Sequence, residues 1–129
     1  MRRIPLGRTG IEIPDLCLGT MTYGTQTNEA DAHRQIDMAL DAGIDFLDTA
    51  HMYPVNPVSA RTRGLTETII GNWVAKSGRR GDTTIATKHI GEGSSVIEGG
   101  SPAISPATIA DSVEGSLKRL RTDYIDLYQ

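Results

Sequence analysis

The chain has 129 residues, of which 38% are hydrophobic and 22% are charged, with a formal net charge of −3. This length and composition are typical of a single compact domain and exclude a disordered chain. The acidic balance, with no basic stripe to neutralise phosphates, argues against nucleic-acid binding. No apolar run reaches the ~18 residues of a membrane span, and no apolar segment of a secretion signal follows the start of the chain, so we expect a cytoplasmic protein.

The chain begins with a predicted hairpin and a short strand. Residues 3–6 and 11–13 flank a segment whose two glycines suit a tight reversal. Residues 16–18 are apolar and are predicted to form the first strand of a second sheet. The single cysteine, Cys17, lies in this strand and cannot form an internal disulfide, so we expect a buried, unreactive thiol.

Three helices are predicted after this strand, each with start or stop signals. Asn28, with an aspartate three positions on, predicts the cap of a helix that ends at Gly43. The second helix ends before Gly78, and the third begins with Ser105 as cap and Pro106 in its first turn. Their predicted buried faces are Ala32, Ile36, Ala39 and Leu40, then Leu65, Ile69, Ile70, Trp73 and Val74, then Ile109, Val113, Leu117 and Leu120.

Further strands are predicted between these helices, over residues 44–48, 83–87 and 124–128, with long loops at 51–64 and 90–102. Strands that alternate with helices predict a parallel sheet. The apolar strands predict that both faces of this sheet are covered.

Two α/β architectures fit this alternation, a doubly wound sheet and part of a (β/α)8 barrel. A dinucleotide-binding sheet would carry a G-x-G-x-x-G motif after its first strand. The sequence at 19–24 does not match that motif, so we favour the TIM barrel family. Eight such units need roughly 250 residues. We therefore expect residues 1–129 to form the N-terminal half of a barrel, the hairpin and the first four strands, without a second domain. The unpaired edges of a half-barrel indicate either a fragment or self-association.

Three polar side chains come directly after two of the predicted strands. Asp48 ends one strand, Lys88 follows the next, and Tyr53 lies in the loop after Asp48. The carboxyl ends of neighbouring parallel strands meet at one edge, about 4.8 Å apart, so an ion pair between Asp48 and Lys88 is geometrically easy. Because a cation stabilises a nearby phenolate, Tyr53 would act as a general acid, with Asp48 orienting Lys88.

Each of these residues also has a structural interpretation. Asp48 would cap its loop, Lys88 would be a solvated lysine at a strand end, and Tyr53 a packed loop aromatic. Their combination at one rim favours a proton-transfer site. His51 and His89 flank them, and with no cysteine or glutamate at ligand spacing we predict rim residues that touch substrate rather than zinc ligands.

Several motifs together resemble the aldo-keto reductase family. They are Asp48-Thr49-Ala50 with Tyr53, Gly64-Leu65-Thr66-Glu67, Ala86-Thr87-Lys88, and Ser116-Leu117-Lys118-Arg119-Leu120 leading to residues 123–129. Within the family, Tyr53-Pro54-Val55 with Gly71-Asn72-Trp73 most resembles the bacterial Tas-like branch.

The resemblance implies an NADPH-dependent oxidoreductase that reduces the carbonyl group of small aldehydes and ketones by hydride transfer. It implies that the catalytic residues include Asp48, Tyr53 and Lys88, and that the residues near the nicotinamide are Gly19, Thr20, Met21 and Asp48. The family's catalytic histidine would follow shortly after Gln129, and most cofactor contacts come from the second half of the barrel. We therefore expect this chain to be inactive alone. The alternative is a non-catalytic regulatory or interaction module.

Overall fold

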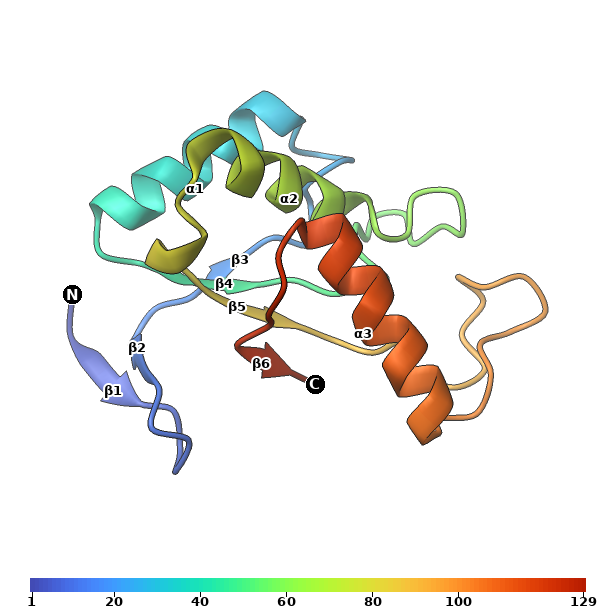
Figure 1. The fold of residues 1–129 in the computed structure, drawn as a ribbon. Coiled ribbons are helices and arrows are strands. Elements are labelled where there is room, and N and C mark those ends of the chain that lie inside the picture. Colours follow the sequence, from blue (N-terminus) through green and yellow to red (C-terminus); the bar gives the residue numbers. More distant parts are fainter.

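The computed structural model describes residues 1–129 and contains two sheets and three α-helices (Figure 1). An antiparallel hairpin is formed by β1 (Arg3–Pro5) and β2 (Glu12–Pro14). The second sheet is parallel, in the order β3 (Leu18–Gly19), β4 (Phe46–Asp48), β5 (Thr84–Thr87) and β6 (Leu127–Tyr128). The helices are α1 (Glu29–Asp41), α2 (Leu65–Ser77) and α3 (Pro106–Leu120), with a short 3-10 helix, η1 (Arg80–Asp82), before β5.

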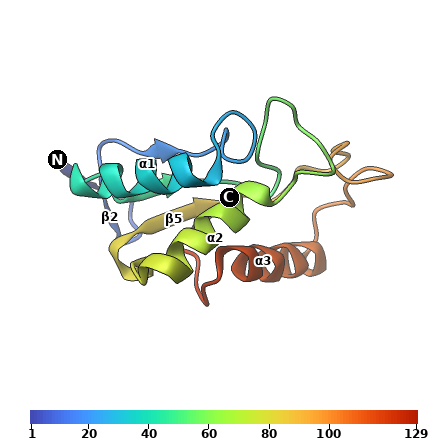
Figure 2. The ribbon, with the colours of Figure 1, turned by 90° about the horizontal axis from the view of Figure 1, so that it is seen from above.

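The three α-helices cover one face of the parallel sheet and follow one another across it in chain order (Figures 1 and 2). No helix covers the other face, so the prediction that both faces would be covered is wrong for these residues. In a barrel that inner face is covered by strands from across the barrel and not by helices. None of the helices combines the length and the apolar character that crossing a lipid bilayer requires.

The predicted helix caps are confirmed. The side chain of Asn28 accepts a hydrogen bond from the Asp31 amide at the start of α1, and Gly43 follows this helix with φ of +82°. Ser105 and Thr108 form a capping box at the start of α3, with Pro106 in the first turn. Local signals therefore set the helix bounds, whereas all four parallel strands are shorter than predicted.

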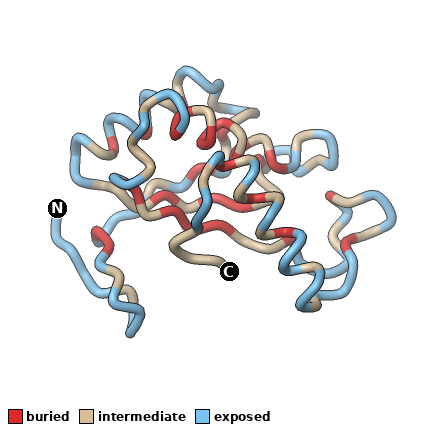
Figure 3. Tube along the Cα trace, viewed as in Figure 1, coloured by how far each residue is buried: buried red, intermediate tan, exposed pale blue.

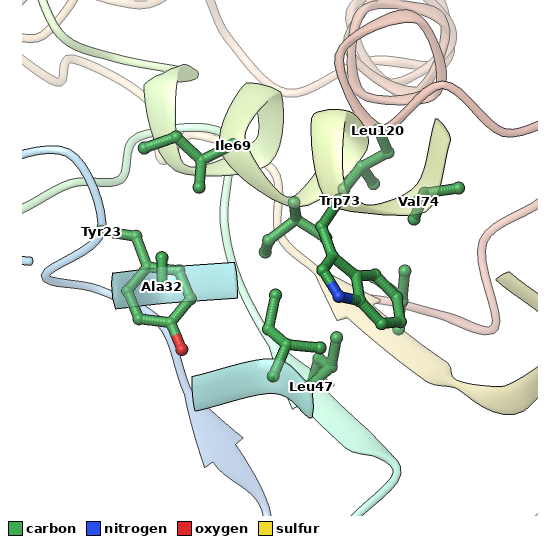
Figure 4. Close-up of a cluster of buried hydrophobic side chains, with 10 residues drawn as sticks. Tyr23, Ala32, Leu47, Ile69, Trp73, Val74 and Leu120 are labelled. Carbon is green, nitrogen blue, oxygen red and sulfur yellow. The ribbon is translucent and has the colours of Figure 1, made fainter. Parts of the chain in front are cut away.

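The core lies between the helices and the parallel sheet and includes the predicted faces of α1 and α2 (Figure 4). Trp73 is the largest side chain in it and is 2% exposed, with its indole N–H donating to Asp37 at 2.9 Å. As predicted, Trp73 is a core residue. The buried core consists of Tyr23, Ala32, Ile36, Leu47, Ile69, Ile70, Trp73, Val74, Ile85 and Leu120.

Two predictions of burial are wrong. Cys17 is exposed and directly precedes Leu18, which packs against the core, and adjacent side chains of an extended chain point to opposite faces. Figure 3 shows that most buried residues lie in the parallel sheet and in the helices that pack on it. On α3 the buried positions are Ser112, Ser116 and Leu120, whereas Ile109 is 37% exposed. The buried face of α3 is thus turned from the apolar stripe, and this helix packs against α2.

The register of the sheet brings the predicted site residues to one edge. Gly19 pairs with Asp48, and Asp48 pairs with Ala86, so Lys88 follows Ala86 by one full pleat on the same face. The hairpin lies at the other end of the strands, where Arg3 pairs at 2.7 Å with Asp45, just before β4. The loops that follow β4 and β5 therefore surround Asp48 and Lys88.

Candidate active site

Asp48 and Lys88 form an ion pair at the carboxyl edge of the sheet. The Lys88 Nζ donates to both Asp48 carboxylate oxygens at 2.7 Å and to the Thr49 carbonyl oxygen at 2.8 Å. These acceptors match the three N–H donors of an ammonium group, so the arrangement fixes the orientation of the lysine. The side chain of Lys88 remains 29% exposed and that of Asp48 32% exposed, so a small molecule can reach both.

Tyr53 lies beside this pair. The Lys88 Nζ is 5.0 Å from the centroid of the Tyr53 ring, within the range of a cation–π contact. The backbone of Tyr53 is held at both ends: its amide donates to the Ala50 carbonyl at 3.1 Å, and its own carbonyl accepts from the Gly64 amide at 3.1 Å. The structure thus brings together the three residues predicted to be catalytic.

The segment after β3 contributes the residues predicted to lie near a cofactor. Gly19 borders Asp48 in the sheet, and a Cβ atom built on it would meet no other atom within 4 Å. The Met21 side chain is 47% exposed. Thr20 differs from both, because it is fully buried and its hydroxyl donates to the Asp48 carbonyl at 2.8 Å. Gly19 and Met21 therefore border open space, whereas Thr20 holds the strand end that carries Asp48.

The sequence as a whole matches a known protein family. The family model described as "Aldo/keto reductase family" matches residues 15–129, which is most of the chain. The chain belongs to the aldo/keto reductase family. Its fold is accordingly that of part of a (β/α)8 barrel, as predicted.

Individual relatives support this assignment and the predicted branch. The Protein tas of Escherichia coli is 48% identical over 129 residues, and the uncharacterized oxidoreductase YrpG of Bacillus subtilis is 46% identical over 127. These alignments cover 98% and 96% of this chain but only 36% and 38% of the relatives. The chain therefore spans little more than a third of the length of these relatives.

A solved structure gives the same result for the fold. The aldo-keto reductase AKR11C1 of Bacillus halodurans, in its holo form, superposes with a TM-score of 0.80 and is 38% identical. The match covers all of this chain and 39% of the reductase. The hairpin, sheet and helices described above thus correspond to part of that reductase's fold.

His51 and His89, predicted at the rim, line one cavity of about 210 Å³. It lies between the loop that follows β5 and the first turns of α3, and Asp111 and Ser112 also line it. Burial, with a smaller contribution from the nearby Arg119 guanidinium, lowers the pKa of His51 to about 4. His51 is therefore neutral near pH 7, with the Ser112 hydroxyl 3.4 Å from its Nδ1.

A charged residue buried beneath this site, Glu67, was not predicted from the sequence. Its side chain is fully buried on the face of α2 that also carries Ile70 and Val74. The signal that could have revealed Glu67 is its spacing, because apolar core residues follow it at i+3 and i+7 on the same helix face. Carboxylates are almost never fully buried unless they are paired, so a carboxylate on that face indicates a buried partner. Glu67 was noted only as part of a family motif.

Proposed function

We propose that this chain carries the proton-donating part of an NADPH-dependent carbonyl reductase. The observation that carries the proposal is the ion pair between Asp48 and Lys88 beside the Tyr53 ring. Tyr53 is the general acid that protonates the carbonyl oxygen of a small aldehyde or ketone. Lys88 stabilises the phenolate that remains after proton transfer, and Asp48 keeps Lys88 charged and oriented.

The residues at the end of β3 fit a nicotinamide cofactor. The open space above Gly19 borders Asp48, so a flat ring can approach the backbone there without meeting a side chain. Gly19, Met21 and Asp48 would contact the ring, and Thr20 would position the strand. NADPH, when bound, supplies the hydride that reduces the carbonyl carbon.

The test is a comparison of two polypeptides. One is the 129-residue chain, and the other joins it to the residues that follow the aligned stretch in Escherichia coli Protein tas. We expect NADPH oxidation with aldehydes from the longer polypeptide and little from the shorter one. Robust reduction by the 129 residues alone would contradict the expectation that they need the rest of a barrel. A folded longer polypeptide that binds NADPH without turnover would instead favour the non-catalytic module.

In the longer polypeptide, Tyr53→Phe should lower kcat by about 100-fold or more, because it removes the proton donor. The affinity for NADPH, measured by fluorescence titration, should change little. The matched control is Tyr124→Phe, since Tyr124 lies before β6, where its ring packs under Arg80, far from the strand exits. An unchanged kcat in Tyr53→Phe would refute the role of general acid.

A further inference from the structure

The fully buried carboxylate of Glu67 joins three elements of the fold. Its Oε1 accepts a hydrogen bond from the Thr87 hydroxyl of β5 at 2.6 Å, and its Oε2 accepts from the Arg119 Nε of α3 at 2.6 Å. Glu67 itself belongs to α2. We propose that Glu67, Arg119 and Thr87 form a positioning unit that sets Lys88 and Tyr53 relative to each other; its catalytic consequence rests on the proposed function.

Stability alone is a weak explanation for this unit. Removing two charges from water costs about as much as their attraction returns, and well-packed apolar side chains often hold such elements equally well. Both oxygens of Glu67 are used, by partners on two different elements, so the geometry is fully specified. A buried ion pair of this kind gives orientation, which an apolar contact does not.

The first link runs to Lys88 through β5. Thr87 and Lys88 are adjacent, and in a strand adjacent side chains point to opposite faces. The Thr87 hydroxyl is bonded on the helix side, so Lys88 is presented on the inner side, toward Asp48. The bond to Glu67 fixes how far β5 extends past α2, and any slip of the strand would move the Lys88 ammonium by the same distance.

The second link runs to Tyr53 through Gly64. The Arg119 side chain lies so close to Gly64 that a Cβ atom there would be 2.7 Å from the Arg119 Cδ. Gly64 has φ of +81°, and its amide donates to the Tyr53 carbonyl at 3.1 Å. Arg119, held by Glu67, therefore supports the turn that holds the backbone of Tyr53. The same carboxylate thus fixes both sides of the Lys88–Tyr53 contact.

The link to Lys88 can be tested without any enzymatic activity, because the chain has only three lysines. Lys76 and Lys118 are exposed internal references for an acetylation time course followed by mass spectrometry. Lys88 should react slowly in the unaltered chain, since its three N–H groups are engaged. Thr87→Val should raise the acetylation rate of Lys88 by about threefold or more relative to the references. Without the bond to Glu67 the strand can shift, and the Lys88 ammonium is then released from its acceptors. Thr87→Ser, which keeps the hydroxyl, should restore the slow rate.

Val74→Ala is the matched control for a general loss of stability. Val74 packs in the core on α2 and is not a member of the Glu67–Arg119–Thr87 unit. It should lower the urea midpoint as Thr87→Val does and leave Lys88 acetylation slow. Equal acceleration of Lys88 by Val74→Ala, or no acceleration by Thr87→Val, would overturn the proposal.

The link to Tyr53 is tested by hydrogen exchange. Glu67→Gln leaves Arg119 without its carboxylate, so the Gly64 amide should exchange about tenfold faster, while amides of α1 keep their rates. An unchanged Gly64 rate would overturn this part. If the longer polypeptide proves to be a reductase, Thr87→Val should lower kcat with KM little changed, and Thr87→Ser should recover it. Acetylation and exchange decide the positioning role even if no reductase activity is found.

Discussion

Gly71 offers a sharp test of the helix packing that carries the site, through the substitution Gly71→Ala. Gly71 lies inside α2, and its Cα faces the backbone at the end of α3. A Cβ atom there would overlap the Arg119 carbonyl oxygen and lie 2.9 Å from the carbonyl carbon of Leu120. These are backbone atoms of a helix end, so they cannot turn aside as a flexible side chain would.

The expected effect combines two opposing contributions. Alanine is favoured over glycine inside a helix by about 1 kcal/mol. Forcing a methyl group into a closely packed site costs roughly 1–3 kcal/mol, and we expect the upper end because α3 must move away as a unit. The net expectation for Gly71→Ala is a loss of about 2 kcal/mol of unfolding free energy.

The matched control is Gly115→Ala on the facing helix. Its Cβ would approach the Arg119 guanidinium, with Nη1 at 3.0 Å, and this end of the side chain can give by a few tenths of an ångström while its Nε stays bonded to Glu67. We expect Gly115→Ala to be neutral or to stabilise the chain by up to about 1 kcal/mol. Both glycines lie within helices, so intrinsic propensity predicts the same sign for both variants. Only the packing predicts opposite signs.

Urea unfolding measures both variants cleanly, because the chain has a single tryptophan, Trp73, buried two positions after Gly71 (Figure 4). With a typical slope of 1–3 kcal/mol per M, a loss of about 2 kcal/mol lowers the midpoint by about 1 M. A Gly71→Ala midpoint equal to or above that of the unaltered chain would refute the reasoning. So would an equal loss in Gly115→Ala.

Two further predictions follow from shifted pKa values. The pKa of His51 is lowered from 6.5 to about 4 on folding. The unfolded chain therefore takes up the proton first, and stability present above pH 6.5 should fall as the pH drops toward 4, by no more than about 3 kcal/mol. His51→Gln should remove this pH dependence in urea midpoints, and an unchanged dependence would contradict the assignment. Partial enclosure of its thiol, with a smaller contribution from the Asp48 carboxylate, raises the pKa of Cys17 to about 11, although the residue is exposed. Alkylation of Cys17 at pH 8 should be about 100-fold slower than for a cysteine of pKa 9, and Asp48→Asn should accelerate it; a rate equal to that in urea would show that the thiol is not shielded.

The helices could be predicted from the sequence because their ends depend on local chemistry. Asn28, Gly43, Gly78 and Ser105 satisfy or terminate the backbone hydrogen bonds of their own helices. Burial on the inner face could not be predicted in the same way. Cys17 has apolar neighbours in the sequence, but whether it is buried depends on which face of the sheet is covered, and that is a property of the whole assembly.

The two ion pairs of the candidate site also differ in how far the sequence could predict them. The Asp48–Lys88 pair was predicted because exits of neighbouring parallel strands lie at a fixed spacing, whatever the surrounding helices do. The Glu67–Arg119 pair was not, because its two residues lie on different helices. Their distance depends on how closely α2 and α3 approach, and no periodicity within one helix contains that information.

The approach of the two helices depends on Gly71, and this connects the packing to the chemistry. Because Gly71 has no side chain, the end of α3 can lie against the backbone of α2, which places the Arg119 side chain beside Gly64 and within 2.6 Å of Glu67. The carboxylate then holds Thr87, and through β5 the position of Lys88. In a barrel, side chains at the rim are only as well placed as the strands that carry them. The contact between α2 and α3 is therefore part of what places the proton donor and its lysine.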